Sequence, residues 1–451
     1  MALTGIQILK MLPKTNCGEC GIPTCLAFGM KVAAGQIEIG ECPYVSDEVK
    51  ETIGEASAPP IRTIKIGGGE TVTTTGGETC LYRHEKRFEN PTGLCVQVTT
   101  DMSDADVDGR IDRFNTIRIE RVGVLMKADL IAVKDTKGDE GAFTGLVQKI
   151  LDNSSDANLI LMTDNPDTMS AAAKACGDRK PLLYGANKDN REAMGNLAKE
   201  LGCPLAVIGT NLDETVEIAE ALLSDGLKDL VIDTGARTMH AAYEDNIVAR
   251  RAAVKKKFKP LGFPTITFPC EITDDPLMET MVASIMIAKY AGIVVLSDLQ
   301  GDTLFPLLLE RLNLFTDPQR PMVVKEDIYP INGPDENSPI LITCNFSLTY
   351  FIVSGEIEGS NVPSWLLIKD TEGLSVLTAW AAGKFGADLI AMFVNKNGIA
   401  DKVKHREIII PGYLATIKGE LEEELPDWTI TIGPREAGHL PAFLKEWKPA
   451  A

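Results

Sequence analysis

Short apolar runs alternate with stretches of helical period between residues 94 and 296. The runs predict strands at Leu94–Thr99, Leu130–Lys134, Leu159–Met162, Leu182–Tyr184, Leu205–Ile208, Leu230–Asp233, Thr265–Phe268 and Ile293–Leu296. Between them, the period predicts helices such as Ile111–Met126, Glu192–Leu201, Thr215–Leu223 and Leu277–Tyr290. Strands and helices in this number and order predict an α/β fold with a closed (β/α)8, or TIM, barrel. An open doubly wound sheet is the alternative.

The alternation resumes in a shorter form after Pro318 and Pro321. Strands are predicted at Ile340–Thr343, Leu366–Lys369, Leu389–Phe393, Glu407–Ile410 and Trp428–Ile432. Helices are predicted at Leu374–Phe385, Tyr413–Leu425 and Glu436–Glu446. The pattern indicates a small open parallel sheet covered on both faces, and such doubly wound sheets bind ligands at the carboxyl ends of their strands.

The part of the chain before the barrel has a different composition. Residues 1–58 are rich in cysteine and poor in large apolar residues. Residues 59–92 combine Gly and Pro clusters with the β-like runs Ile61–Ile66 and Thr71–Thr75, which predict hairpins and a linker. The predicted domains are therefore 1–58, a linker at 59–92, a barrel at 93–318 and a terminal α/β domain at 319–451.

Charge narrows the possible partners. The 451 residues include 64 acidic and 45 basic ones, for a net charge of −19. This balance argues against binding to nucleic acid or to an anionic membrane surface. No apolar run reaches the roughly 18 residues that span a bilayer, and Met1–Pro13 is too short and polar for a secretory signal. We expect a cytoplasmic protein with reduced cysteines.

Four of the ten cysteines lie close together near the start, with the spacing Cys17-x2-Cys20-x4-Cys25-x16-Cys42. Thiolates bind soft metals, and Gly18 and Gly21 permit backbone conformations that aim amides at sulfur. Pro43 follows the last cysteine, as in ferredoxin motifs. This pattern favours a [4Fe-4S] cluster, with zinc or unliganded thiols as alternatives. The other six are expected to be mostly small buried hydrophobes: Cys80, Cys95, Cys176, Cys203, Cys270 and Cys344.

Polar residues follow the predicted barrel strands, where barrel enzymes place their chemistry. They are Asp101, Lys134-Asp135-Thr136, Thr163-Asp164-Asn165, Asn187-Lys188, Thr210-Asn211, Asp233-Thr234 and Cys270-Glu271. Such residues also cap helices, so they form either a set of caps or a rim that contacts a ligand or partner. No metal-ligand set and no nucleophile–base pair stands out among them.

The strand-end loops of the terminal domain carry small and amide-bearing residues. They are Thr343-Cys344-Asn345, Asp370-Thr371-Glu372-Gly373, Asn395-Lys396-Asn397-Gly398, Pro411-Gly412 and Gly433-Pro434. An edge of this kind can approach a flat, amide-rich ligand, although turn and cap roles are the alternative for each residue. The absence of Gly-x-Gly-x-x-Gly there and of a phosphate-binding Gly-x4-Gly-Lys argues against a dinucleotide and against ATP hydrolysis.

Three segments of this domain carry a resemblance, together with the cysteine spacing and the barrel-sized array. They are Cys344–Tyr350, Glu372–Trp380 and Gly433–Ala437. The chain resembles the large (gamma) subunit of the corrinoid iron-sulfur proteins of the acetyl-CoA (Wood–Ljungdahl) pathway. These subunits are also the gamma subunits of acetyl-CoA decarbonylase/synthase complexes. The resemblance covers the full length and implies a cluster domain, a TIM barrel and a Rossmann-like corrinoid-binding domain.

The resemblance implies a methyl carrier. Cobalt(I) of a corrinoid would take a methyl group from methyltetrahydrofolate on a separate methyltransferase and deliver it to acetyl-CoA synthase. A [4Fe-4S] cluster would pass an electron from a low-potential donor to cobalt that has oxidised to cobalt(II). The family member pairs with a small barrel subunit as a heterodimer.

Residue by residue, the resemblance implies that Cys17, Cys20, Cys25 and Cys42 hold the cluster. The corrin and its nucleotide tail would lie on the strand-end edge of the terminal sheet. There, Thr378 is the residue expected nearest the upper face of cobalt. The implied contacts are Thr343, Cys344, Tyr350, Leu374, Ser375, Val376, Leu377, Thr378, Gly433 and Ala437.

Many cobalamin domains supply a cobalt ligand from an Asp-x-His-x-x-Gly loop, and this chain has none. None of its four histidines, His84, His240, His405 and His439, follows an Asp by two residues. A cobalt without a strong lower ligand is easier to reduce to cobalt(I), because axial ligands set a cofactor's potential.

Two other functions stay open. The barrel could bind the pterin and catalyse methyl transfer, through residues such as Asp164, Asn165, Asn187 and Asp233, or the chain could be a simple electron-transfer protein.

Overall fold

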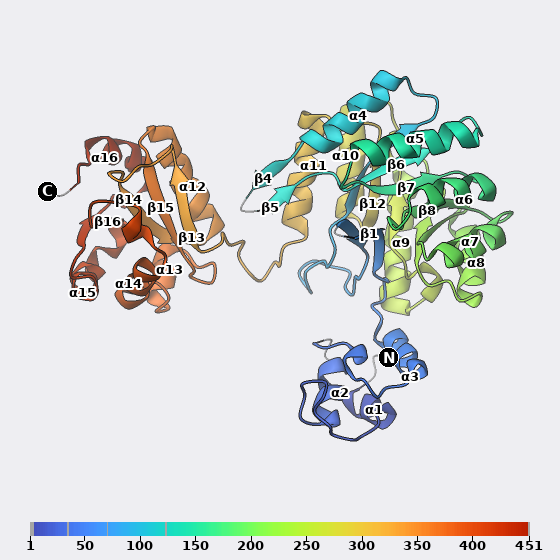
Figure 1. Ribbon diagram of the computed structural model, residues 1–451, viewed down its shortest axis with the longest axis horizontal. Coiled ribbons are helices and arrows are strands. Elements are labelled where there is room, and N and C mark those ends of the chain that lie inside the picture. Colours follow the sequence, from blue (N-terminus) through green and yellow to red (C-terminus); the bar gives the residue numbers. More distant parts are fainter. Residues whose placement is uncertain (1–3, 34–35, 70, 122–123, 450–451) are drawn as a thin grey trace. The chain divides into compact units, whose positions relative to one another are not determined.

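The computed structural model describes residues 4–33, 36–69, 71–121 and 124–449 (Figure 1). The chain forms two compact units. One holds Met1–Ile117 and Lys127–Phe315, and the other holds Arg118–Met126 and Thr316–Ala451. No helix of the described chain has the length and apolar character needed to cross a membrane.

The cysteine-rich segment folds into short helices around a small apolar core. They are α1 (Gly5–Met11), α2 (Cys25–Ala33), the 3-10 helix η1 (Ile39–Glu41) and α3 (Asp47–Ser57). Thr4 and Gln7 form a reciprocal capping box that fixes the start of α1. Glycines let α1 and α2 pack closely, because a Cβ on Gly29 would lie 2.9 Å from the Gly5 carbonyl oxygen. The buried residues of this core include Ile8, Leu12, Phe28, Val32 and Ile53.

The predicted hairpin is present as antiparallel strands β1 (Ile64–Gly68) and β2 (Thr71–Thr75). The hairpin is not part of a free linker but packs onto the barrel, since Ile64 and Ile66 belong to the same buried cluster as side chains of the barrel strands. The Thr75 hydroxyl donates to the Gly292 carbonyl at 3.0 Å, which places the hairpin at the amino ends of the strands. A buried ion pair, Glu78 with Arg250 at 3.4 Å, ties the following segment to the barrel.

Eight parallel strands close into a barrel, as the sequence predicted (Figure 1). Their order around the barrel is β3-β6-β7-β8-β9-β10-β11-β12, with β12 pairing back to β3. Their side chains are buried almost throughout, as expected for a parallel sheet covered by helices. The strands are β3 (Gly93–Thr99), β6 (Leu130–Lys134), β7 (Asn158–Met162), β8 (Leu182–Ala186), β9 (Leu205–Ile208), β10 (Leu230–Asp233), β11 (Thr265–Thr267) and β12 (Ala291–Leu296).

Helices surround the barrel in the predicted alternation. They are α4 (Asp104–Thr116), α5 (Glu140–Asn153), α6 (Pro166–Ala175), α7 (Arg191–Leu201), α8 (Leu212–Ser224), α9 (Met239–Lys256), α10 (Pro276–Ala288) and α11 (Gly301–Leu314), with 3-10 helices η2 (Lys259–Leu261) and η3 (Pro269–Glu271). Most begin at a side-chain cap; Asp139, for example, accepts from the backbone N–H of Ala142.

The prediction of a helix over Ile111–Met126 was wrong at both ends. Helix α4 begins earlier, because Ser103 caps it and its first turn is acidic. The helix ends at Thr116, and the chain continues into a small antiparallel hairpin of β4 (Ile119–Arg121) and β5 (Val124–Met126). This hairpin belongs to the second unit, where the Arg121 guanidinium lies 4.8 Å from the ring centre of Phe351.

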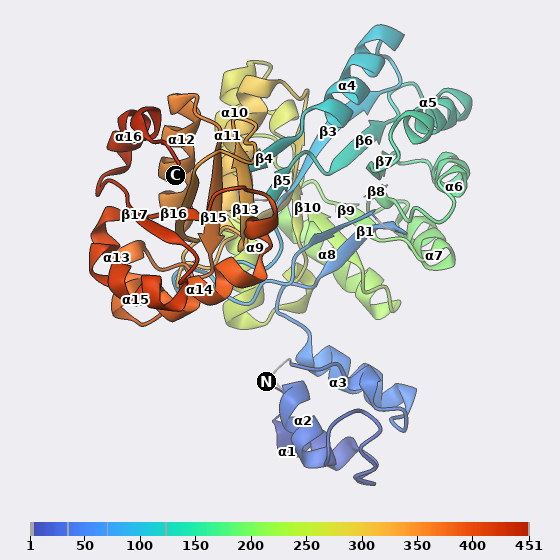
Figure 2. The same cartoon turned by 60° about the vertical axis from the view of Figure 1, so that its left-hand side comes forward.

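The second unit contains an open five-stranded sheet of order β13-β15-β14-β16-β17 (Figure 2). Four of its strands, β15, β14, β16 and β17, are parallel, and β13 is an antiparallel edge. The elements are β13 (Asp327–Ile331), β14 (Ile340–Cys344), α12 (Ser347–Ser360), β15 (Ser364–Lys369), α13 (Val376–Ala381), α14 (Ala387–Lys396), η4 (Ile399–Asp401), β16 (Glu407–Ile410), η5 (Gly412–Ile417), α15 (Lys418–Glu424), β17 (Thr429–Ile432), η6 (Ala437–His439) and α16 (Leu440–Glu446).

Two predictions in this sheet were wrong. Leu389–Phe393 lies in helix α14, where Ile390 is fully buried while Met392 remains 63% exposed. The run therefore has a helical face that its strand-like composition hid. The fifth strand is instead β13, which the sequence analysis missed because it is half-exposed and contains Pro330. An edge strand tolerates a proline because one row of its backbone groups is unpaired.

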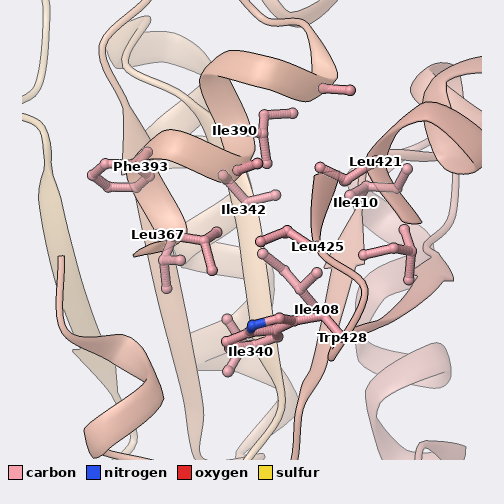
Figure 3. Packing of buried hydrophobic residues seen from close by; sticks show 14 of the residues in the cluster. Ile340, Ile342, Leu367, Ile390, Phe393, Ile408, Ile410, Leu421, Leu425 and Trp428 are labelled. Carbon is pink, nitrogen blue, oxygen red and sulfur yellow. The ribbon is translucent and has the colours of Figure 1, made fainter. Parts of the chain in front are cut away.

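Helices cover both faces of this sheet. On one face, α14 and α15 bury Ile390, Phe393 and Leu421 against Ile342 and Ile410 of the strands (Figure 3). On the other face, α12 and α16 pack on the alternate strand residues. Adjacent strand positions face opposite sides, so Leu341 and Ile409 belong to this second cluster. The two layers leave the carboxyl edge of the sheet to the loops.

Candidate functional site

The four early cysteines lie in one small domain: Cys17 and Cys20 on the loop before α2, Cys25 at the start of α2, and Cys42 directly after η1. Cys17 and Cys20 flank a turn in which the Gly21 N–H donates to the Gly18 carbonyl at 2.9 Å. Both glycines have left-handed backbone conformations, with φ of +76° and +75°, that other residues rarely adopt. Cys25 opens α2.

The surroundings of the thiols suit sulfur ligands of a metal. The backbone N–H of Asn16 donates to Sγ of Cys25 at 3.4 Å, while its side-chain oxygen accepts from the Cys25 N–H at 2.8 Å. Cys42 is buried in the apolar core of the domain, and Cys20 packs against that core. All four are free thiols. Within the described ranges, however, no three or more Cys, His, Asp or Glu side chains converge as a metal site.

A cavity of ≈ 430 Å³ opens at the carboxyl edge of the C-terminal sheet. Its floor is formed by the ends of β14 and β16, and its walls by α12, the start of α13 and the loops after β16 and β17. The lining residues are mostly apolar or small: Leu341, Ile342, Thr343, Thr349, Ile352, Val353, Ser375, Val376, Leu377, Ile409, Ile410, Pro411, Tyr413, Gly433, Pro434, Arg435, Glu436, Ala437, Gly438 and Leu440.

Six of the ten residues predicted as corrinoid contacts line this cavity. They are Thr343, Ser375, Val376, Leu377, Gly433 and Ala437. The structure brings them together from three segments: the end of β14, the start of α13 after β15, and the stretch after β17. Each segment lies at the carboxyl end of a parallel strand, so the six residues share the edge that the sequence analysis expected.

The other four predicted contacts lie elsewhere in the same unit. Cys344 is fully buried, because it points to the face of the strand opposite Thr343. Tyr350 packs on Tyr329, with ring centres 5.2 Å apart, and Leu374 packs against the buried cluster of Figure 3. Thr378 is exposed, and its hydroxyl oxygen lies 3.1 Å from that of Ser375.

The sequence analysis missed the cavity residues of α12 and the charged rim. Thr349, Ile352 and Val353 share one face of α12, and their spacing of three and four residues was a signal for it. Tyr413 and Glu436 directly follow the strands β16 and β17, so their position in the sequence was also informative.

Asn345 holds the loop that carries Ser375, Val376 and Leu377. Its side-chain oxygen accepts hydrogen bonds from the Thr371 N–H at 3.0 Å and the Gly373 N–H at 3.1 Å. Its side-chain nitrogen donates to Asp370 at 2.8 Å. Asn345 is 3% exposed, so these bonds are shielded from water. This buried amide fixes one wall of the cavity.

The carboxyl mouth of the barrel carries a different kind of site. Asp233, at the end of β10, is 2% exposed and accepts hydrogen bonds from the Tyr184 hydroxyl at 2.5 Å and from Arg237 at 2.8 Å. Arg237 also binds Glu271, which in turn accepts from Lys134 at 2.6 Å. Two cations therefore neutralise two carboxylates within the mouth.

The pKa shifts in this network follow from its contacts. Burial, together with the neighbouring Asp233 charge, raises the pKa of Tyr184, so its hydroxyl remains a donor. Burial alone would lower the pKa of Arg237, but Asp233 and Glu271 raise it. Burial would raise the pKa of Glu271, but Lys134 and Arg237 lower it. The raised pKa of Arg237 and the lowered pKa of Glu271 keep these two groups charged at neutral pH, while Tyr184 keeps its proton.

Other polar residues of the barrel rim act as caps. Asn165 accepts from the N–H groups of Asp167 and Thr168 at the start of α6. Asn187 accepts from the Asp189 N–H at 2.9 Å, and Asn211 caps α8 by accepting from Glu214. Of the two interpretations of this rim, the contacts support capping.

Comparisons with known proteins match the chain along its whole length. Residues 63–444 match the family described as the CO dehydrogenase/acetyl-CoA synthase delta subunit, and residues 12–44 match an Fe-S cluster family. The corrinoid/iron-sulfur protein large subunit of Moorella thermoacetica is 44% identical over 445 residues, which are 99% of this chain and 99% of that protein. The chain belongs to the corrinoid/iron-sulfur protein large-subunit family.

Two further members of the corrinoid/iron-sulfur large-subunit family are gamma subunits of acetyl-CoA decarbonylase/synthase complexes. The Methanopyrus kandleri protein is 34% identical, with 98% of each chain covered. The Methanothermobacter thermautotrophicus protein is 32% identical, with 98% of this chain and 99% of that protein covered. The resemblance inferred from the sequence is confirmed, and the Fe-S match contains all four early cysteines.

Proposed function

We propose that this chain is the methyl-carrying, corrinoid-binding subunit of an acetyl-CoA-synthesising system. The full-length match at 44% identity to a corrinoid/iron-sulfur protein large subunit carries the proposal. The cavity at the carboxyl edge of the C-terminal sheet supports it, because that edge gathers six of the residues expected to contact the corrinoid. The domain boundaries at 58, 92 and 318, and the Rossmann-like character of the last domain, belong to the same proposal.

In this proposal Cys17, Cys20, Cys25 and Cys42 hold a [4Fe-4S] cluster. The cluster would supply the electron that returns cobalt(II) to cobalt(I). The donor set fits in chemistry, since four free thiols share one small domain and the Asn16 N–H already donates to Cys25. The buried core beneath Cys42 would shield one side of the cluster from water.

The corrinoid would rest on the cavity edge. Its cobalt would accept a methyl group from methyltetrahydrofolate on a methyltransferase and pass it to acetyl-CoA synthase. The chain's own residues would supply apolar walls from α12 and the strand ends, and hydroxyl groups from Thr343, Thr349 and Ser375. No histidine is among the described residues that line the cavity.

The structure does not favour methyl transfer by the barrel itself. That alternative requires free acidic or amide groups at the mouth for the pterin. Asp233 is instead paired with Arg237 and Tyr184, and the amides of Asn165 and Asn187 cap backbone groups. Three of the four residues considered for this role are therefore already engaged, which leaves Asp164 alone among them to recognise a pterin.

The proposed partners follow from the family. They are a small subunit that completes a heterodimer, a methyltetrahydrofolate methyltransferase, acetyl-CoA synthase and a low-potential electron donor. We propose a cytoplasmic, anaerobic setting. The net charge of −19 supports the absence of nucleic-acid partners.

Visible spectra of the anaerobically purified protein test the proposal. Corrinoid bands should shift on reduction and again on methylation, and metal analysis should find both cobalt and iron. A protein that holds iron and no cobalt would contradict the carrier and favour an electron-transfer protein. Methyl transfer from methyltetrahydrofolate without an added methyltransferase would favour the barrel enzyme.

The cluster's role has its own test. Cys20→Ala should leave methyl carriage by pre-reduced protein intact and abolish reactivation from cobalt(II), because one of four cluster ligands is lost. Cys176→Ala is the matched control, since Cys176 is a buried thiol of the barrel. Normal reactivation in the Cys20 variant would show that the cluster does not supply the electron.

A further inference from the structure

One hydrogen bond joins two loops at the rim of the C-terminal cavity. Tyr413, in η5 after β16, donates its hydroxyl to Oε1 of Glu436, in the loop after β17, at 2.7 Å. Both side chains line the cavity, and both are exposed. The bond therefore lies at the cavity mouth and not in its floor, where it would be shielded from water.

Beneath this bond, the two loop backbones are already as close as they can be. The Gly412 N–H donates to the Pro434 carbonyl at 3.1 Å, and the Gly433 N–H donates to the Ile410 carbonyl at 2.9 Å. A Cβ on Gly412 would lie 2.5 Å from the Gly433 oxygen, so only glycine fits there. The backbone thus holds the two loops together, and the Tyr413–Glu436 bond adds a side-chain link between them at the mouth.

Part of the cavity rim is apolar. Ile352 of α12 and Leu377 of α13 line the cavity, yet they are 48% and 46% exposed. Exposed apolar side chains beside a cavity are typical of a ligand-binding edge.

We propose that the Tyr413–Glu436 bridge retains the nucleotide tail of the bound corrinoid in this cavity. The inference rests on the proposed corrinoid function. The tail hangs from one edge of the corrin ring, so it can enter a cavity while the ring remains outside. The bridge must open for the tail to enter or leave. Its re-formation over the bound tail slows escape by about three- to tenfold, the worth of one hydrogen bond.

Two corrinoids that differ only in the tail test this role. Cobalamin has the nucleotide tail and cobinamide lacks it. The intrinsic fluorescence of the full chain reports on binding in this unit, because all four tryptophans lie between residues 365 and 447. Dissociation is followed by fluorescence after dilution or chase. Wild-type protein should release cobalamin more slowly than cobinamide.

Substitutions of Tyr413 and Glu436 then distinguish an effect of their hydrogen bond on the release rate from an effect of general packing. Tyr413→Phe and Glu436→Ala should each speed cobalamin release by about three- to tenfold and leave cobinamide release unchanged. The double variant should be no faster than either single one, because both remove the same bond. Glu436→Gln keeps an acceptor oxygen and should retain slow release.

Tyr44→Phe is the matched control. Tyr44 makes a similar exposed bond, to Glu19 at 2.8 Å, but in the N-terminal domain, so its loss should leave both release rates unchanged. If Tyr413→Phe speeds the release of both corrinoids equally, or of neither, the proposed role of the bridge is wrong. The proposed methyl-carrier function is not affected by that result. Failure of the wild-type protein to bind either corrinoid overturns the proposed function, and the bridge with it.

Discussion

The barrel mouth and the C-terminal cavity occupy equivalent places in two parallel sheets, and their side chains differ sharply. At the barrel mouth, Lys134, Asp233, Arg237 and Glu271 are bound to one another. In the cavity, apolar and hydroxyl side chains surround ≈ 430 Å³ of space, and charges stand only on the rim. One edge is filled by its own polar groups, and the other is open to a ligand.

The difference shows what topology decides and what it leaves to the side chains. Parallel strands place loops from several parts of the chain at one edge, so either edge can hold a site. Whether that edge binds a ligand depends on whether its polar groups are already satisfied. Each prediction below changes one of the two regions and measures stability, corrinoid affinity or both.

The largest effect is expected from Arg237→Ala. It leaves Asp233, which is 2% exposed, as a buried charge without its cation. Removing one partner of a buried ion pair costs about 3–5 kcal/mol. The free energy of unfolding of the barrel should therefore fall by about 3 kcal/mol. Circular dichroism in urea measures this. Corrinoid affinity should stay unchanged.

The control for that variant is an exposed pair on the same barrel. Lys188 and Glu217 lie 3.9 Å apart and are 61% and 70% exposed. Lys188→Ala should therefore cost less than about 0.5 kcal/mol. If Arg237→Ala costs no more than Lys188→Ala, the mouth is not held by its charges and could open for a ligand.

The next effect concerns the wall of the cavity. Asn345→Ala removes the acceptor of the Thr371 and Gly373 N–H groups, which are buried. Unsatisfied buried donors cost about 1–3 kcal/mol each, so the C-terminal unit should lose about 2–3 kcal/mol. Corrinoid affinity should fall with it, because the loop to Ser375 loses its support. Tryptophan fluorescence in urea follows this unit.

Asp370→Asn tests whether the Asn345 side chain acts through the loop backbone or through its bond to Asp370. Its remaining oxygen can still accept from the Asn345 side chain, so the loss should stay below about 1 kcal/mol. Equal losses in the two variants would show that Asn345 acts through Asp370 alone and not through the loop backbone.

A smaller effect is expected from filling the cavity. Thr349→Trp places a large side chain from α12 into the space that the ligand would use. Corrinoid affinity should fall about tenfold, which is about 1.4 kcal/mol, while stability changes by less than about 1 kcal/mol. Leu348→Trp is the control, because Leu348 is 57% exposed and does not line the cavity. Similar losses in both variants would place the ligand elsewhere.

The barrel was predictable from the sequence because its strands are continuous apolar runs that alternate regularly with helical stretches. The terminal sheet was harder, because α14 carries Leu389–Phe393 with strand-like composition, while β13 is a half-exposed edge. Only the three-dimensional packing shows that Ile390 is buried and Met392 is exposed.

The candidate site was predictable as an edge and less so as a set of residues. Thr343 and Cys344 are neighbours in the sequence, but strand alternation sends only Thr343 into the cavity. The bond between Tyr413 and Glu436 joins residues that are 23 positions apart. No local pattern predicts such a pair, because it depends on how close two loops come.

The smallest expected effect is that of pH. It distinguishes the two regions, because the stability of the barrel should depend on pH while corrinoid affinity should not. The pKa of Glu271 is lowered; burial opposes this shift, but the bonds from Lys134 and the charge of Arg237 outweigh burial. Its contribution to stability is therefore present above its ordinary pKa of 4.5 and is lost as pH falls through the lower, folded-state pKa. The buried Glu279 has a raised pKa and acts with the opposite sign.

From pH 6 to pH 4, Glu271→Gln should thus flatten the loss of barrel stability, and Glu279→Gln should steepen it. The urea midpoint at each pH measures both. Corrinoid affinity between pH 6 and pH 8 should stay level in all three proteins, because the described residues inside the rim of the cavity include no carboxylate, histidine or amine. A pH-dependent affinity in that range would mean that a titrating group, and not an apolar wall, determines binding at the cavity.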